Sequence, residues 1–267
     1  MPPEDGLVKG ATANPRYLIS TVSILSDMDL SDPTRAVAPT LDGTVLAVLA
    51  AAGKPLTVGQ VASLAARGSE IGIRRTLSRL VEQGTVRATI MGRNQVHELN
   101  RDHVAAQVAE ALAGLRVELW ARFRNVLDTW RPRPLYACVF GSAARGDGTA
   151  ESDIDLLVVH PPFLGETKPE RMSPALRANL SDALGAAAMV ADDPKAEHRW
   201  ENHLENLHSL VEGWTGNSLQ IVDLSFWEWR RPPKSYQPLL KAIAADGIEL
   251  RKARGLKWWP TLKADVG

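Results

Sequence analysis

Two aspartates near the middle of the chain, Asp153 and Asp155, stand one residue apart at the start of an apolar run. Side chains on a β-strand alternate between faces, so both carboxylates point the same way while Ile154 points into a core. Two carboxylates this close repel each other unless a cation lies between them, and an all-oxygen environment suits a hard ion such as Mg²⁺. The pair therefore predicts a metal site.

A Gly-Ser turn, Gly141-Ser142, precedes the aspartate pair by ten residues. Gly141 allows the backbone to approach a ligand closely, and Ser142 offers a hydroxyl and an N–H group to phosphate oxygens. Apolar runs on either side of the loop predict two short buried strands, Pro134 to Phe140 and Ile154 to Val159. We expect these strands to bring the turn and the aspartates together as a site for phosphate and metal.

The order Gly141-Ser142, ten residues, Asp153-Ile154-Asp155 resembles the pattern of the polymerase-β-like nucleotidyltransferase superfamily. The closest likeness is to its minimal nucleotidyltransferase branch, which includes toxin–antitoxin proteins. This resemblance implies an enzyme that transfers a nucleoside monophosphate from an NTP, with ATP the expected donor, to an acceptor hydroxyl. It implies one or two Mg²⁺ ions on Asp153 and Asp155, and phosphates held by Gly141, Ser142 and Arg145.

The resemblance also implies a third carboxylate on a later strand. The run from Leu219 to Ser225 predicts such a strand, and Asp223 lies within it. A lone carboxylate in an apolar run is costly to bury without a partner. Asp223 is thus expected to share the catalytic metal and to accept the acceptor's proton. The segment before it is longer than in the compact family pattern and predicts two helices, Ser173 to Val190 and Asp193 to Trp214.

Length and composition limit the classes of protein. A chain of 267 residues exceeds the usual single domain, so two domains are expected. The 31 basic and 31 acidic residues balance, which gives no overall electrostatic case for nucleic-acid binding. The single cysteine, Cys138, cannot form an internal disulfide. Without a signal sequence or an apolar run of about eighteen residues, we expect a cytoplasmic protein with no membrane contact.

The N-terminal part predicts a separate small domain. Residues 1–38 show no sustained periodicity and predict a loosely ordered lead-in. Over residues 39–102, three helical patterns precede two strand-like runs joined by Gly92-Arg93-Asn94. This order resembles a winged helix-turn-helix domain. The resemblance implies DNA contacts on the third helix and the wing, made by Arg75, Thr76, Arg79 and Arg93. A protein-docking or dimerisation role for the same domain is the open alternative.

A long amphipathic pattern over residues 103–131 predicts a helix that connects this domain to a nucleotidyltransferase domain at residues 132–267. The whole chain is therefore expected to be of the α+β class, with a mixed sheet flanked by helices in its C-terminal half. The apolar stripe of the connecting helix, Val108 to Trp130, predicts either packing against that sheet or a coiled-coil seam in a homodimer.

The acceptor is not defined by the residues. Within the resembled branch it is a tyrosine of a partner protein, the 3′ end of a tRNA or a small aminoglycoside-like molecule. A fused winged helix favours a macromolecular acceptor and a toxin–antitoxin or regulatory system. The alternative function is a DNA-binding transcriptional regulator whose nucleotidyltransferase domain senses nucleotide.

Overall fold

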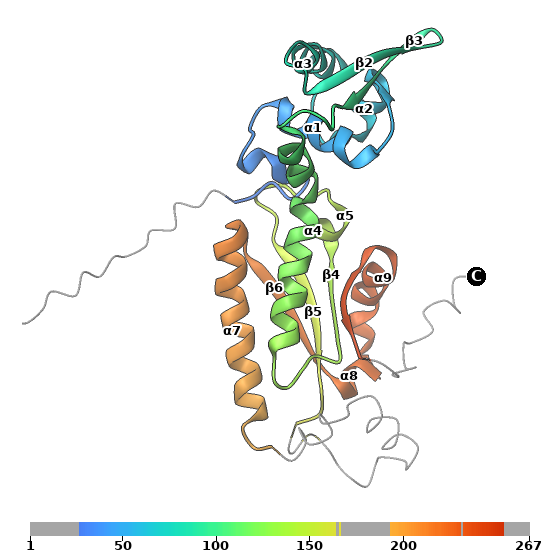
Figure 1. Ribbon diagram of the computed structural model, residues 1–267. Helices are drawn as coiled ribbons and strands as arrows, with labels where there is room; N and C mark the ends of the chain where they lie inside the picture. The colour runs from blue at the N-terminus through green and yellow to red at the C-terminus, as the bar shows by residue number, and fades with distance from the viewer. Residues whose placement is uncertain (1–26, 164–165, 167–192, 231, 254–267) are drawn as a thin grey trace, which may run out of the picture.

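The computed structural model describes residues 27–163, 166, 193–230 and 232–253. A small N-terminal unit lies at one end of a larger unit, and α4 (Ala106–Thr129) runs from one into the other (Figure 1). Helices together with one antiparallel and one mixed sheet confirm the α+β class. The helix predicted from Ser173 and the C-terminal tail with Trp258 lie outside the described residues.

The N-terminal unit contains helices packed on a small antiparallel sheet of order β1-β3-β2. Its elements are α1 (Leu41–Ala52), β1 (Leu56–Thr57), α2 (Val58–Leu64), α3 (Glu70–Glu82), β2 (Val86–Met91) and β3 (Asn94–Leu99). A capping box begins α2, because Thr57 Oγ1 accepts from Gln60 N and Gln60 Oε1 accepts from Thr57 N. At the start of α3, Ser69 Oγ accepts from Gly72 N, a single N-cap hydrogen bond.

The long helix α4 contributes to the cores of both units. Ala106 and Ala109 pack into the N-terminal core, and Phe123 and Leu127 are buried in the core of the larger unit. The prediction that this helix packs against the sheet is confirmed for its second half. Its first half differs, since Val108 is 60% exposed and does not belong to the buried stripe.

The larger unit is organised around a sheet of order β6-β5-β4-β7. Strands β5 and β6 pair in parallel, whereas β4 pairs with β5 and β7 in antiparallel fashion. The strands are β4 (Tyr136–Phe140), β5 (Ile154–His160), β6 (Leu219–Ser225) and β7 (Ile248–Lys252). The helices are α5 (Gly141–Arg145), α7 (Ala196–Thr215), α8 (Phe226–Arg230) and α9 (Gln237–Asp246).

Each face of this sheet has its own core, because β-strand side chains alternate. Ile154, Leu156 and Val158 of β5 pack with α4 and α7, and we call this side the α4/α7 face. Leu157 and Val159 pack with α8 and α9 on the other side, the α8/α9 face. Figure 1 shows α4 and α7 together on one side of the strands and α9 on the other. The face to which a residue belongs therefore decides what it can reach.

Residues 27–40, which we call the strap, join the two units. The strap includes a short 3-10 helix (Pro33–Ala36), and Leu30 is only 3% exposed within the core on the α4/α7 face. Met28 N donates to Thr215 O at 2.8 Å, which fixes the strap against the end of α7. The prediction of a loosely ordered lead-in is therefore wrong for residues 27–38, and its first 26 residues lie outside the description.

In the described part of the chain, no helix combines the length and the apolar character needed to cross a lipid bilayer.

Candidate active site

The Gly-Ser turn and Asp155 touch each other at one end of the sheet. Phe140 at the end of β4 is paired with Asp155 near the start of β5, so the turn after β4 begins beside this carboxylate. Gly141 has φ +70°, and a Cβ atom added there would lie 2.4 Å from Asp155 Oδ2. Both the left-handed backbone and the close carboxylate require glycine. The two parts of the predicted site are thus in direct contact.

The two aspartates of the pair differ in exposure. Asp153 is exposed just before β5, and Asp155 is half-buried within it. Neither carboxylate accepts a hydrogen bond from the residues that the structure describes. Burial raises the pKa of Asp155, the Asp153 charge raises it further, and attraction by Arg145 opposes both. Carboxylates without compensating donors are suited to a cation.

Arg145 lies at the end of α5 and is partly engaged by other acids. Its Nε atom is 3.0 Å from Asp147 Oδ2, and its Nη1 atom is 3.6 Å from Asp246 Oδ2 on α9. The guanidinium is still close enough to Asp155 to lower the pKa of that carboxyl. Ser142 lies in the same short helix, beside Gly148 of the following loop. Arg145 and Ser142 therefore both border the aspartate pair.

Asp223 does not join this site, contrary to the prediction. On β6, Asp223 is paired with Val158 of β5, whereas Asp155 is paired with Gln220, three residues before Asp223. Because side chains alternate, Asp223 points to the α4/α7 face, where Trp200 Nε1 donates to Asp223 Oδ2 at 2.9 Å. Asp223 as a whole residue is exposed, but its carboxylate is largely buried. This burial raises the pKa of Asp223, and the His160 charge and the Trp200 hydrogen bond oppose the rise. Asp223 cannot share a metal ion with Asp153 and Asp155.

Asp153 and Asp155 offer carboxylate oxygens as ligands for a metal ion. Within the described ranges, no group of three or more His, Cys, Asp or Glu side chains is placed to hold a metal. Two free carboxylates nevertheless fit Mg²⁺, which keeps several waters and is often held by one or two carboxylates together with substrate phosphates. The residues present therefore fit an ion that the substrate helps to hold, and they do not form an all-protein cage.

Asn217 holds the loop before the aspartate pair in place, a role that no motif in the sequence indicates. Its side chain is 1% exposed, and Nδ2 donates to Ala150 O at 2.9 Å and to Ser152 O at 3.2 Å. The same amide group bonds Met28 through both its N–H and its C=O. Asn217 thereby connects the strap, the loop that leads to Asp153 and the start of β6.

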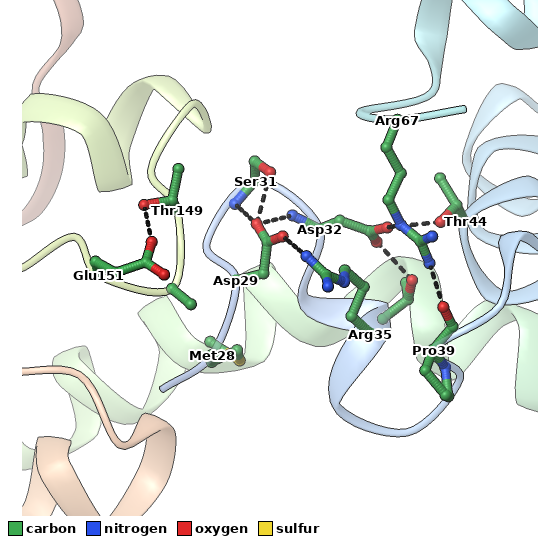
Figure 2. Close-up of polar contacts among 12 residues, drawn as sticks. Met28, Asp29, Ser31, Asp32, Arg35, Pro39, Thr44, Arg67, Thr149 and Glu151 are labelled. Carbon is green, nitrogen blue, oxygen red and sulfur yellow. Dashed lines mark hydrogen bonds and ion pairs between the residues drawn. The ribbon is translucent and has the colours of Figure 1, made fainter. Parts of the chain in front are cut away.

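The strap is also fastened to the N-terminal unit, as Figure 2 shows. Asp32 accepts hydrogen bonds from Thr44 Oγ1 at 2.6 Å and from Arg67 Nε at 2.7 Å. Asp29 accepts from Ser31 and from Arg35. At its other end, Leu30 lies against Gly148, where an added Cβ atom would be 3.2 Å from Leu30 Cβ. The N-terminal unit is thus linked by one short segment to the loop beside Ser142.

The four residues predicted to contact DNA differ in exposure and in their ion pairs. Thr76 is 4% exposed and belongs to the buried side of α3, so its predicted DNA contact is wrong. Arg79 forms an ion pair with Asp42 at 2.6 Å, which directs it toward α1. Arg75 and Arg93 are exposed and have no ion pair in the part of the chain that is described. Of the predicted set, these two arginines remain free to meet a phosphate.

The segment with the Gly-Ser turn and the aspartate pair was compared with known families. Residues 120–201 match the family model described as nucleotidyltransferase domain. This segment is therefore similar to nucleotidyltransferase domains. It extends from the middle of α4 through β5 to the beginning of α7 and contains Gly141, Ser142, Asp153 and Asp155. The matched segment ends before β6, so the comparison does not involve Asp223 or Asn217.

Two further comparisons add little to the nucleotidyltransferase assignment. A solved structure with 18% identity is that of a Sulfolobus solfataricus protein described provisionally as a nucleotidyltransferase. The likeness covers 55% of this chain and 95% of that chain, with a TM-score of 0.21, too low to support a fold assignment. No curated protein matches the chain. The mixed sheet flanked by helices is consistent with a nucleotidyltransferase fold.

Proposed function

We propose that this protein transfers a nucleoside monophosphate from an NTP, ATP in the first instance, to a hydroxyl group of a macromolecule. The observation that carries the proposal is the contact between Gly141 and the Asp155 carboxylate within the nucleotidyltransferase domain. In this proposal the turn binds phosphate and the aspartate pair binds a cation, and their contact supports a single site for both. Phosphoryl transfer requires little more from a protein than positioning and charge neutralisation.

In the proposed reaction, the acceptor hydroxyl oxygen attacks the α-phosphorus and releases its proton to solvent. The bond between the α-phosphorus and the oxygen that bridges to the β-phosphate breaks, and pyrophosphate leaves. Asp153 and Asp155 would hold one or two Mg²⁺ ions, which would supply positive charge to the phosphate oxygens. The backbone at Gly141 and the Ser142 hydroxyl orient the terminal phosphates, and Arg145 adds a positive donor beside them. Asp223 has no part in this mechanism, because it lies on the opposite face of the sheet.

For the acceptor, we propose a protein tyrosine or a tRNA end, within a toxin–antitoxin or other regulatory system. The support is the N-terminal unit, which the strap links to the loop beside Ser142 and which offers a macromolecular acceptor additional surface. The test supplies α-³²P-labelled NTPs to the purified protein, together with total tRNA or with the proteins encoded by neighbouring genes. Label that becomes covalently attached to one of these fractions identifies the acceptor class.

Asp153→Asn is expected to lower this label transfer at least about 100-fold, because one of the two cation-binding charges is lost. The matched control is Glu205→Gln, which removes an exposed carboxylate on α7 away from the site and should leave transfer unchanged. Equal transfer by the Asp153 variant and the wild-type protein would refute the proposal.

A second candidate function is DNA binding by the N-terminal unit as a winged helix. It is favoured by the exposed Arg75 on α3 and Arg93 in the β2–β3 turn, both without an ion pair among the described residues. The protein would then regulate transcription, with the nucleotidyltransferase domain sensing nucleotide. The two functions are compatible in an autoregulating antitoxin.

Arg75→Ala is expected to weaken binding to the promoter of the protein's own operon and to reduce the slope of log K against log salt by about one. Arg122→Ala, which removes an exposed arginine of α4, serves as the control. Fluorescence anisotropy at several salt concentrations measures both effects. An unchanged slope for Arg75→Ala would exclude α3 as the DNA-contacting helix.

A further inference from the structure

Gln220 is the β6 residue that faces the aspartate pair. In the parallel register of β5 and β6, Gln220 is paired directly with Asp155. Its neighbours Leu219 and Ile221 pack into the core on the α4/α7 face, and Val222 packs on the α8/α9 face. Alternation along the strand then places Gln220 on the α8/α9 side, the side of Asp155.

The Gln220 side chain is free to act there. The residue is exposed, and its amide makes no hydrogen bond to any residue that the structure describes. Directly paired residues on neighbouring strands have Cβ atoms about 5 Å apart, so the flexible Gln220 side chain reaches whatever Asp155 binds. An amide offers one carbonyl oxygen to a hard cation and one NH₂ group to a phosphate.

An amide at this position makes the site less acidic than a third carboxylate would. The site then contains two negative charges, from Asp153 and Asp155, and a neutral oxygen from Gln220. Affinity for a divalent cation rises with the number of charged ligands. A site with two charges binds the bare cation weakly, whereas the phosphates of an NTP supply the missing charge.

We propose that Gln220 is the third protein group of the nucleotide site, and that its neutrality makes cation binding depend on the nucleotide. The proposal rests on the function proposed above and specifies its substrate form as the metal–NTP complex. Gln220 contributes its carbonyl oxygen to the cation or its NH₂ group to the triphosphate, and leaves the nucleotide-free site with low metal affinity.

The test measures Mn²⁺ binding by the intensity of the free-ion EPR signal, with the full-length protein. Mn²⁺ replaces Mg²⁺ because both prefer oxygen ligands. Titrations are made without nucleotide and with a non-hydrolysable ATP analogue, for the wild-type protein, Gln220→Glu and Gln220→Ala. Because the analogue itself binds Mn²⁺, the same titration without protein is subtracted from each. Gln107→Glu adds the same charge at an exposed position of α4 and is the control. Thermal unfolding followed by circular dichroism shows that each variant is folded.

Wild-type protein is expected to bind Mn²⁺ measurably only with the analogue. Gln220→Glu should raise nucleotide-free Mn²⁺ affinity at least about tenfold, because it adds a third charge. Gln220→Ala should weaken binding of the metal–analogue complex about tenfold. Gln107→Glu should change neither.

Unchanged Mn²⁺ binding in folded Gln220→Glu and Gln220→Ala would overturn the proposal. Asp155→Asn distinguishes this failure from a failure of the proposed function. If Asp155→Asn abolishes binding of the metal–analogue complex while the Gln220 variants have no effect, the site exists without Gln220. If Asp155→Asn also has no effect, the nucleotide site itself is refuted, and this proposal with it.

Discussion

Asn217→Ala is expected to lower the free energy of unfolding by about 3 kcal/mol, although Asn217 is remote in sequence from every predicted site residue except Asp223. The Asn217 side chain is buried and bonds backbone groups of Met28, Ala150 and Ser152. Alanine leaves these carbonyl groups without that donor, and each buried group left without a partner costs about 1–3 kcal/mol. Urea unfolding monitored by tryptophan fluorescence measures the difference.

The same substitution is expected to weaken nucleotide binding at temperatures where the variant is still folded. Ser152, which Asn217 holds, is followed directly by Asp153, so release of the loop removes the fixed position of the first carboxylate. Asn217→Asp keeps the size of the side chain but loses the NH₂ donor and directs a charge toward carbonyl oxygens, so it should be at least as harmful. Asn125→Ala, at an exposed position of α4, should change stability by no more than about 0.5 kcal/mol. A loss below about 1 kcal/mol for Asn217→Ala would contradict this role.

The sequence was sufficient to locate most of the elements and the centre of the site. Apolar runs placed β5 and β6 within a few residues of their observed bounds, because their side chains decide local structure. The contact between Gly141 and Asp155 followed from a short connection between two strands, which must return the chain to the same end of the sheet.

The predictions for Asp223 and Thr76 were wrong because the face on which each residue lies depends on how its strand or helix packs. A polar residue in an apolar strand indicates a position of interest, but the face on which it lies is fixed only by the pairing with the next strand. Asp223 and Gln220 lie on opposite faces of β6, and nothing in the run from Leu219 to Ser225 says which face meets Asp155. Thr76 was assigned to the exposed side of α3 in the same way, and packing of the helix decided otherwise.

The role of the strap could not be predicted for a different reason. Residues 27–40 show no periodicity, because they lie in an extended path with one short turn of 3-10 helix. Their order comes from single contacts with residues far along the chain, such as Arg67 with Asp32 and Asn217 with Met28. Contacts of this kind leave no pattern in the sequence.

Asp32→Ala is expected to lower the free energy of unfolding by about 3–5 kcal/mol, the cost of removing one partner from a buried ion pair. Asp32 is 3% exposed, and its carboxylate accepts from Thr34, Thr44 and Arg67 (Figure 2). Without it, the partly buried Arg67 guanidinium keeps only the carbonyl groups of Pro39 and Thr40. The matched control is Asp102→Ala, since the Arg87–Asp102 pair is exposed on both sides and should contribute no more than about 1 kcal/mol.

The pH dependence of stability distinguishes the contribution of the Asp32 charge from that of its side-chain packing. Burial alone would raise the pKa of Asp32, but hydrogen bonds from Thr34, Thr44 and Arg67 outweigh burial and hold that pKa below its usual value. A carboxyl whose pKa is lowered by folding stabilises the protein above its unfolded pKa, and this contribution is lost as pH falls through the folded pKa. Asp32→Asn should therefore be less stable than wild type at neutral pH, and the difference should shrink below about pH 4. A difference that stays constant from pH 7 to pH 3 would mean that the Asp32 charge does not hold the strap.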